Sequence, residues 1–574
     1  MLRCTSRTPF FLCVVLLLLP TLATAEITPE TLLVQMRDGV SLSTDVYRSA
    51  DWTTGPVVLV RTPYDKSRVA SVAEQFVDAG YAAVIQDCRG RLESEGVFIP
   101  YNNEGQDGYD TIEWLNRQDW CNGRIGMWGA SYFGATQWQA AAEKPDGLIA
   151  ICPTATWTDF YRNLYQGGSI RISMLTSWAA RMSQPEGATQ PTDWNSVFMR
   201  LPLSEVDDQI GWPIPWFENM LTHPRPDGYW HRLELSDEVG ELDLAIQHVV
   251  GYYDFFSRES VDNFKLMQER ASTLSVRKKQ QLILGPWDHG TIGRSKVGDY
   301  DFGETAVWDR NAANIDWLDR FLKDTSKAKL KAFSPVRYFS MGDNQWYDAT
   351  SWPPNGVKHT SFYLHSNGNA NTRNGDGRLS RKAPRSAQPA DEFVSNPADP
   401  APANVFDENR EIHQVTFGPV DQSSISDRDD VLVFTSGSLE EDIAFAGNAK
   451  ARLFVSADTP DADWVVKLID VHPDGFAQNL VVGVMRGQFR NSELELEPLE
   501  PNKVYEIEVD LGPVAATVQK GHELRIDICG AYFPLFDRNT NTGKGPYNGE
   551  TLISHERVYH SPKQPSRLIL PIKR

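Results

Sequence analysis

Ser131 lies in a stretch of sequence that is typical of a serine nucleophile. Residues 128–134 read Trp-Gly-Ala-Ser-Tyr-Phe-Gly, with an apolar run before them and an alanine-rich, helix-forming run after them. A nucleophile on a sharp turn between a strand and a helix needs small neighbours, because the helix packs closely against the strand. The usual pattern has its second glycine at position 133, where this chain has Phe133. The motif alone leaves a buried structural serine as the alternative.

His289 is the histidine best placed to accept the proton of such a serine. In strand–helix hydrolases the orienting acid and then the histidine follow the serine in the chain, each just beyond a strand. His289 follows a short apolar strand, residues 281–284, and the turn Gly-Pro-Trp-Asp. The other three histidines between Ser131 and residue 330 lie in a region rich in Pro and Trp or inside an apolar run. We therefore expect His289 at the carboxyl end of a parallel strand, where sites of α/β sheets lie.

Asp254 is the preferred candidate for the acid that orients the histidine. It stands directly after residues 249–253, an apolar run that reads as a strand. Asp288 is the rival, but sequence neighbours rarely form the side-chain hydrogen bond that an orienting acid must make with the histidine. Asp243 precedes the strand and would lie at the wrong end of the sheet.

Two hydrogen-bond donors are expected to stabilise the oxyanion of the tetrahedral intermediate. One is the backbone N–H of Tyr132, the residue after the nucleophile. The other is sought in the loop 61–66, which follows the apolar strand 57–60. Tyr64 in this loop offers a phenolic hydroxyl, and a packed loop tyrosine is the alternative interpretation.

Several segments, taken in order, carry a family resemblance. The segments are Arg-Thr-Pro-Tyr-Asp-Lys (61–66), Gln-Asp-Cys-Arg-Gly (86–90), Ser-Glu-Gly (94–96), Gly-Met-Trp-Gly-Ala-Ser-Tyr-Phe-Gly (126–134), Gly-Tyr-Tyr-Asp (251–254), Gly-Pro-Trp-Asp-His (285–289) and Phe-Pro-Leu-Phe-Asp-Arg-Asn (533–539). In these segments the chain resembles the cocaine-esterase-like (CocE/NonD) serine hydrolases, which are related to X-prolyl dipeptidyl peptidases, α-amino-acid ester hydrolases and glutaryl-cephalosporin acylases. The resemblance runs from about residue 30 to the end of the chain.

The resemblance implies a role for each candidate site residue. In this family a tyrosine follows the serine and the second glycine is displaced by one position, as it is here. Ser131 would be the nucleophile, His289 the base and Asp254 the acid. Tyr64 and the amide of Tyr132 would form the oxyanion hole.

The elements around these residues predict an α/β-hydrolase domain with a helical lid insertion, followed by a C-terminal β jelly-roll domain. Residues 26–150 and 244–334 alternate short apolar strands with helical segments, as in a mostly parallel sheet. Residues 151–243 interrupt this pattern with aromatic, helical and Pro-rich segments, and the resemblance implies a lid there. Residues 335–574 show short strands separated by turn residues, which indicates a β-sandwich, and the resemblance implies a jelly roll.

Residues 1–25 are predicted to be a signal peptide. They combine Arg3 and Arg7, the apolar run 10–19 and an Ala-Thr-Ala cleavage site at 23–25. The run is shorter than the ~20 apolar residues of a membrane-spanning helix. We therefore expect a secreted or periplasmic protein with no membrane attachment after cleavage.

Composition limits the expected partners. The 574 residues suffice for two or three domains, and a formal net charge of −20 disfavours nucleic acid as a partner. No metal-binding motif is recognised and no cofactor is expected. The four cysteines beyond the signal peptide allow three pairings, and Cys152 and Cys529 are predicted to be buried thiols. Oligomeric state stays open, with a homo-oligomer among the alternatives.

The leading hypothesis is a secreted serine hydrolase that cleaves small-molecule carboxylic esters through an acyl-enzyme. The alternative is an X-prolyl dipeptidyl peptidase or an α-amino-acyl or β-lactam acylase, which would use the same triad on amides. A third class, a carbohydrate-binding protein with an inactive hydrolase domain, would be expected to have a broken triad. Phe133, Trp157 and Phe256 are predicted substrate contacts in a mainly apolar pocket, which would favour uncharged esters over those with a free α-ammonium group.

Overall fold

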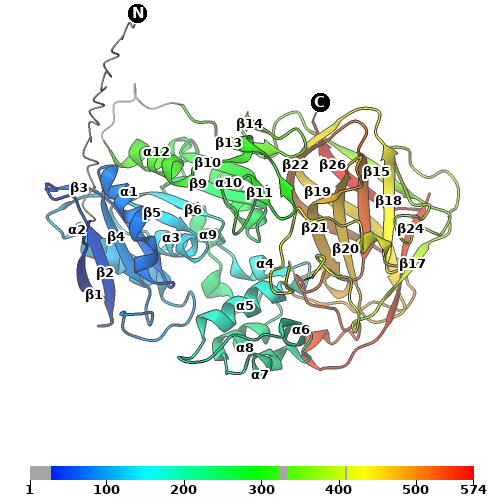
Figure 1. Ribbon diagram of the computed structural model, residues 1–574, viewed down its shortest axis with the longest axis horizontal. Coiled ribbons are helices and arrows are strands. Elements are labelled where there is room, and N and C mark those ends of the chain that lie inside the picture. The colour runs from blue at the N-terminus through cyan, green and yellow to red at the C-terminus, as the bar shows by residue number, and fades with distance from the viewer. Residues whose placement is uncertain (1–26, 324–331, 408–409, 574) are drawn as a thin grey trace, which may run out of the picture.

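Two parts of the molecule lie side by side in the computed structural model, which describes residues 27–323, 332–407 and 410–573. Figure 1 shows an α/β part in blue to green and a β-rich part in yellow to red. The predicted signal peptide, residues 1–25, lies outside the described residues. Within them, no helix has both the length and the apolar character needed to cross a membrane.

The α/β part is built on one sheet of ten strands, counted over the described residues. The strands from β4 to β13 along the sheet run parallel, and the strands at both edges pair antiparallel. In spatial order they are β1 (Glu30–Gln35), β2 (Ser41–Tyr47), β4 (Ala82–Asp87), β3 (Gly55–Thr62), β5 (Cys121–Ala130), β6 (Leu148–Thr154), β9 (Ala245–Tyr253), β10 (Gln280–Asp288), β13 (Val336–Ser340) and β14 (Gln345–Ala349).

Helices cover both faces of this sheet, as the apolar runs of its central strands require. Val57 and Leu59 of β3 join one buried cluster with α2, α3 and α10. Val58 and Val60, which point to the opposite face, join another cluster with α1 and α12. The helices of this part are α1 (Ala70–Asp78), α2 (Glu104–Asn116), α3 (Tyr132–Ala142), α10 (Ser257–Arg270), α11 (Leu274–Arg277) and α12 (Arg310–Leu322).

The predicted insertion separates β6 from β9 and lies beneath both parts in Figure 1. Within the aromatic stretch 157–182 of the insertion, a short hairpin separates α4 from α5. Two glycines with positive φ, Gly167 and Gly168, form its turn. The elements are α4 (Phe160–Leu164), β7 (Tyr165–Gln166), β8 (Ser169–Ile170), α5 (Ile172–Met182), α6 (Trp194–Phe198), α7 (Val206–Ile210), α8 (Pro215–Leu221) and α9 (Ser236–Val239).

The β-rich part contains a second sheet of twelve strands among the described residues. Alternate side chains are buried along the middle of β19, as in a strand with one face toward a core, whereas β20 and β21 are buried almost throughout. Its strands are β15 (Lys358–His365), β16 (Arg378–Ser380), β17 (Asp391–Ser395), β18 (Val431–Ser438), β19 (Ile443–Ala457), β20 (Asp463–Val471), β21 (Ala477–Arg486), β22 (Tyr505–Val518), β23 (Glu523–Cys529), β24 (Ser554–Ser561), β25 (Gln564–Pro565) and β26 (Arg567–Ile572).

The first sheet extends beyond the predicted domain boundary at residue 335. Strands β13 and β14 follow that boundary, yet β13 pairs with β10 and both strands belong to the first sheet. A short strand in the sequence does not show which sheet it joins, because pairing depends on partners far away in the chain. The change between sheets falls between Ala349 and Lys358.

The cysteines agree with the sequence-based expectation. Cys88, Cys121, Cys152 and Cys529 are free thiols, so no disulfide links the described residues. Cys152 and Cys529 are buried, as predicted, and burial raises the pKa of both thiols.

Candidate active site

Ser131 occupies a strained turn between β5 and α3. Its φ of 59° and ψ of −123° are unusual for a residue with a side chain, which agrees with the predicted elbow. The Ser131 N–H donates to the Thr154 carbonyl at 2.9 Å, and the Thr156 hydroxyl donates to the Ser131 carbonyl at 2.9 Å. A Cβ at Gly134 would lie 2.6 Å from Cβ of Thr156. A glycine is therefore needed at position 134, where helix α3 closely approaches Thr156 just after β6.

Asp254 and His289 lie together because their strands are parallel neighbours. Strands β9 and β10 end in register, with Tyr253 opposite Asp288, so the next residue of each reaches the same edge. His289 Nδ1 lies 2.9 Å from Asp254 Oδ2, and the second oxygen, Oδ1, accepts the Phe256 N–H at 2.8 Å. The Asp254 side chain is fully buried.

The Asp254 carboxylate raises the proton affinity of the imidazole. Burial lowers the pKa of His289, but the charge and hydrogen bond of Asp254 outweigh it and hold the pKa above its ordinary value of 6.5. Asp288, the rival acid, accepts through Oδ1 from the Gly290 N–H at 2.9 Å and the Thr291 hydroxyl at 2.8 Å, and through Oδ2 from the Thr416 hydroxyl at 3.2 Å. Its bonding partners therefore leave Asp254 as the carboxylate paired with the imidazole.

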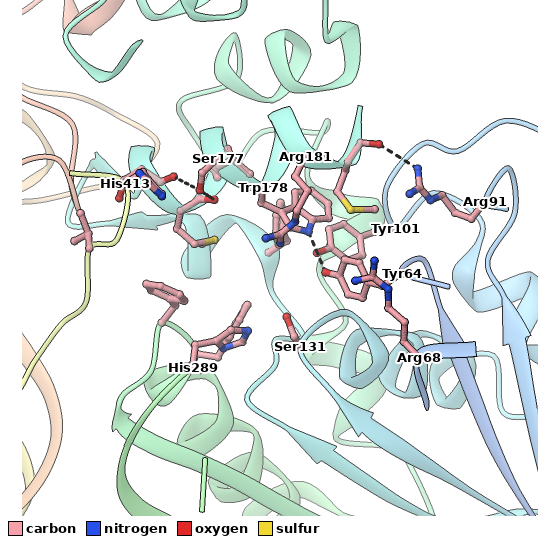
Figure 2. A pocket seen from close by; sticks show the side chains of 18 residues that line it. Tyr64, Arg68, Arg91, Tyr101, Ser131, Ser177, Trp178, Arg181, His289 and His413 are labelled. Atoms are coloured by element: carbon pink, nitrogen blue, oxygen red, sulfur yellow. Dashed lines mark hydrogen bonds between the residues drawn. The ribbon is translucent and has the colours of Figure 1, made fainter. Parts of the chain in front are cut away.

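Ser131, His289 and Tyr64 line one cavity of about 690 Å³. In Figure 2, Ser131 lies between His289 on one side and Tyr64 on the other. The N–H of Tyr132 begins helix α3, where the first N–H groups have no acceptor within the helix. The predicted nucleophile, base and hydroxyl donor therefore face a common space.

Trp178 holds the Tyr64 hydroxyl in place, and the sequence did not predict this contact. The indole Nε1–H of Trp178, on α5 of the insertion, donates to Tyr64 Oη at 3.0 Å (Figure 2). Burial raises the pKa of Tyr64, and its hydrogen bonds with Trp178 and Ser131 partly oppose that shift. Because an indole N–H only donates, the Tyr64 proton stays available for an acceptor in the cavity.

Of the three predicted substrate contacts, Phe256 alone lines the cavity, where its ring lies 5.3 Å from the His289 ring. Phe133 instead packs against Tyr64, with 5.5 Å between ring centroids. Trp157 is 1% exposed and lies beneath Tyr101 and Phe160. Trp157 is therefore too buried to contact a substrate, and Phe133 does not line the cavity, because nearness to the serine or to the insertion in sequence does not determine which way a side chain points.

Comparisons with known proteins agree with this arrangement. Residues 38–291 match the family described as X-Pro dipeptidyl-peptidase (S15 family), and residues 328–569 match the X-Pro dipeptidyl-peptidase C-terminal non-catalytic domain. Cocaine esterase of Rhodococcus sp. (strain MB1 Bresler) is 35% identical, over 95% of this chain and 98% of that protein.

Two solved structures share the whole architecture. An aminopeptidase from a marine sediment archaeon, Thaumarchaeota archaeon, has a TM-score of 0.84 at 25% identity, covering 100% of this chain and 99% of that one. An α-amino acid ester hydrolase has a TM-score of 0.82 at 24% identity, covering 99% and 98%, a likeness of fold alone. With its full-length similarity to cocaine esterase, the chain belongs to the cocaine-esterase-like family of serine hydrolases.

Proposed function

We propose that this serine hydrolase cleaves carboxylic esters through an acyl-enzyme, with Ser131 as nucleophile, His289 as base and Asp254 as orienting acid. The observation that carries the proposal is the 2.9 Å contact between His289 Nδ1 and Asp254 Oδ2, beside a cavity that His289 shares with Ser131. With Nδ1–H held by the carboxylate, Nε2 is left unprotonated and able to accept the serine proton.

The reaction then follows from the positions of these groups. Ser131 Oγ attacks the ester carbonyl carbon while His289 Nε2 takes its proton. Tyr64 and the Tyr132 N–H donate to the oxyanion. Protonated His289 gives the proton to the departing alcohol, and water, activated by the same imidazole, then releases the acid.

The same proposal gives the insertion and the β-rich part a role in enclosing the active site. We take residues 151–243 to be a lid, because Met174, Trp178 and Arg181 of α5 line the cavity. We take the C-terminal part to be a jelly roll that helps to close the site, because His413 and Val415 also line it. Secretion to the periplasm or outside the cell, through a signal peptide at residues 1–25, is proposed from the sequence alone.

The reaction type is tested with the purified mature protein and three matched substrates. The substrates are a phenylacetyl ester, the corresponding anilide and an X-Pro anilide. The ester differs from the two anilides in the bond that is cleaved, and the X-Pro anilide also carries a free ammonium group. We expect the ester to have the highest kcat/KM, since the described lining of the cavity contains no carboxylate to pair with an ammonium group. A higher kcat/KM for the X-Pro anilide would assign the protein to the peptidase alternative.

Tyr64→Phe is expected to lower kcat by about 10²–10³-fold, because it removes one oxyanion donor and keeps the ring. KM should change little, since the hydrogen bond strengthens mainly in the transition state. Steady-state kinetics on one ester measure both quantities. Trp178→Phe is the companion variant, because it deletes the hydrogen bond to Tyr64 Oη and should lower kcat less than Tyr64→Phe does. An effect on KM alone would make Tyr64 a substrate contact.

A further inference from the structure

Positively charged side chains line the active-site cavity. Among the residues that the structure describes, the lining includes Arg68, Arg91 and Arg181 and no aspartate or glutamate. The remaining lining is mainly aromatic and aliphatic, with a few serines and histidines. A charged group in such surroundings attracts the opposite charge more strongly than it would in open water.

Arg91 is held in place by the protein itself. Its Nε donates to the Pro63 carbonyl at 2.9 Å and one terminal nitrogen donates to the Met182 carbonyl at 3.1 Å. Its guanidinium carbon also lies 5.0 Å from the centre of the Phe98 ring. Burial lowers the pKa of Arg91, as expected where a cation has lost water without gaining a carboxylate.

Arg68 and Arg181 are free to bind a ligand. Both are exposed, and across the described residues no carboxylate lies within 4.0 Å of either guanidinium. Other cations near the cavity are paired, as the contacts of Lys66 with Glu93 and of Arg89 with Asp107 show. Figure 2 shows Arg68 beside Tyr64, across Ser131 from His289. Unlike most surface arginines, these two face a cavity that contains the candidate nucleophile.

The charge of Arg181 is close enough to act on the candidate catalytic groups. It lowers the pKa of Tyr64 against the larger effect of burial, and it opposes the rise that Asp254 causes in the pKa of His289. A ligand bound to Arg181 would therefore lie close to Ser131.

We propose that Arg68 and Arg181 bind a carboxylate carried by the ester substrate, so that the preferred substrates are anionic esters. The inference rests on the proposed function and adds the substrate class to it. A guanidinium group is suited to this role because its planar donors match both oxygens of a carboxylate. The same charges repel a free α-ammonium group, which agrees with the expected discrimination against amino-acyl substrates.

The test uses pairs of esters that differ only in charge. For a carboxylate on the acyl side, monomethyl adipate is compared with the methyl ester of adipic acid monoamide. For one on the alcohol side, 3-carboxyphenyl butyrate is compared with 3-carbamoylphenyl butyrate. We expect the anionic member of at least one pair to have a roughly ten- to hundredfold higher kcat/KM, as for hydrogen bonds to charged groups. The pair that shows the preference identifies which side of the ester the arginines hold.

Variants test whether these arginines cause the preference. Arg181→Gln and Arg68→Gln should each reduce the anionic-to-neutral ratio of kcat/KM, mainly through a higher KM for the anionic ester. Arg181→Lys should keep part of the ratio, because the charge remains. Arg385→Gln, which removes an exposed arginine of the β-rich part, is the matched control and should leave the ratio unchanged. Added salt should weaken the preference.

The outcomes separate this inference from the proposed function. Equal or faster hydrolysis of the neutral ester in both pairs would overturn the inference and leave esterase activity intact. A preference that survives in the double variant Arg68→Gln/Arg181→Gln would also overturn it. Failure to hydrolyse any of the four esters would count against the proposed function itself.

Discussion

Ser131→Ala is expected to lower kcat for ester hydrolysis by about 10⁶-fold and to abolish labelling by a fluorophosphonate probe. Among the described residues of the cavity, Ser131 is the only nucleophile that lies between His289 and Tyr64. The variant therefore has no group there that could form an acyl-enzyme. Losses of this size are typical when a nucleophile that works with a histidine is removed. Intact mass spectrometry of the labelled protein measures the stoichiometry, and turnover is followed on the same sample.

Two controls make the result specific. Ser272→Ala changes an exposed serine outside the cavity and should be labelled like the wild type. Thermal unfolding of Ser131→Ala should show a folded protein, so that lost labelling is not lost structure. Equal labelling of Ser131→Ala and wild type would reject the assignment of the nucleophile.

The residues that the sequence placed correctly are those fixed by local structure and parallel strand order. Ser131 was found because an elbow between a strand and a helix needs small residues close by in the chain. Asp254 and His289 were found because each follows an apolar run, and parallel strands carry such residues to one edge of the sheet. Their contact at 2.9 Å confirms that the two side chains meet.

The parts that the sequence missed depend on contacts between distant segments. Trp178 lies 114 residues after Tyr64, and no spacing links an indole in the insertion to a loop after β3. Arg68 and Arg181 read as ordinary surface charges until the fold brings them to one cavity. Trp157 failed as a predicted contact for the same reason, because the packing of Tyr101 and Phe160 over it could not be read from the chain.

Asp254→Asn is expected to lower kcat by about 10⁴-fold while the overall geometry is kept. Asp254 Oδ1 accepts the Phe256 N–H, so in the variant the amide oxygen should keep that position. The amide nitrogen then faces His289 Nδ1 and donates to it, which moves the imidazole proton to Nε2. In that tautomer Nε2 cannot accept the serine proton. Asp288→Asn is the matched control and should lose far less activity, since the Asp288 carboxylate bonds to Gly290, Thr291 and Thr416 and not to the imidazole.

The pH dependence gives a second, independent test of Asp254. His289 must be neutral to act as base, and its pKa lies above 6.5 in the wild type because Asp254 outweighs the effect of burial. Activity should therefore rise with pH through a limb above about 6.5. In Asp254→Asn the carboxylate is gone but the imidazole stays buried, so the pKa of His289 should fall. The pH range over which the residual activity rises should therefore shift to lower pH. Profiles of kcat/KM against pH for both proteins measure the shift. An unchanged limb would show that another acid raises the pKa of the histidine.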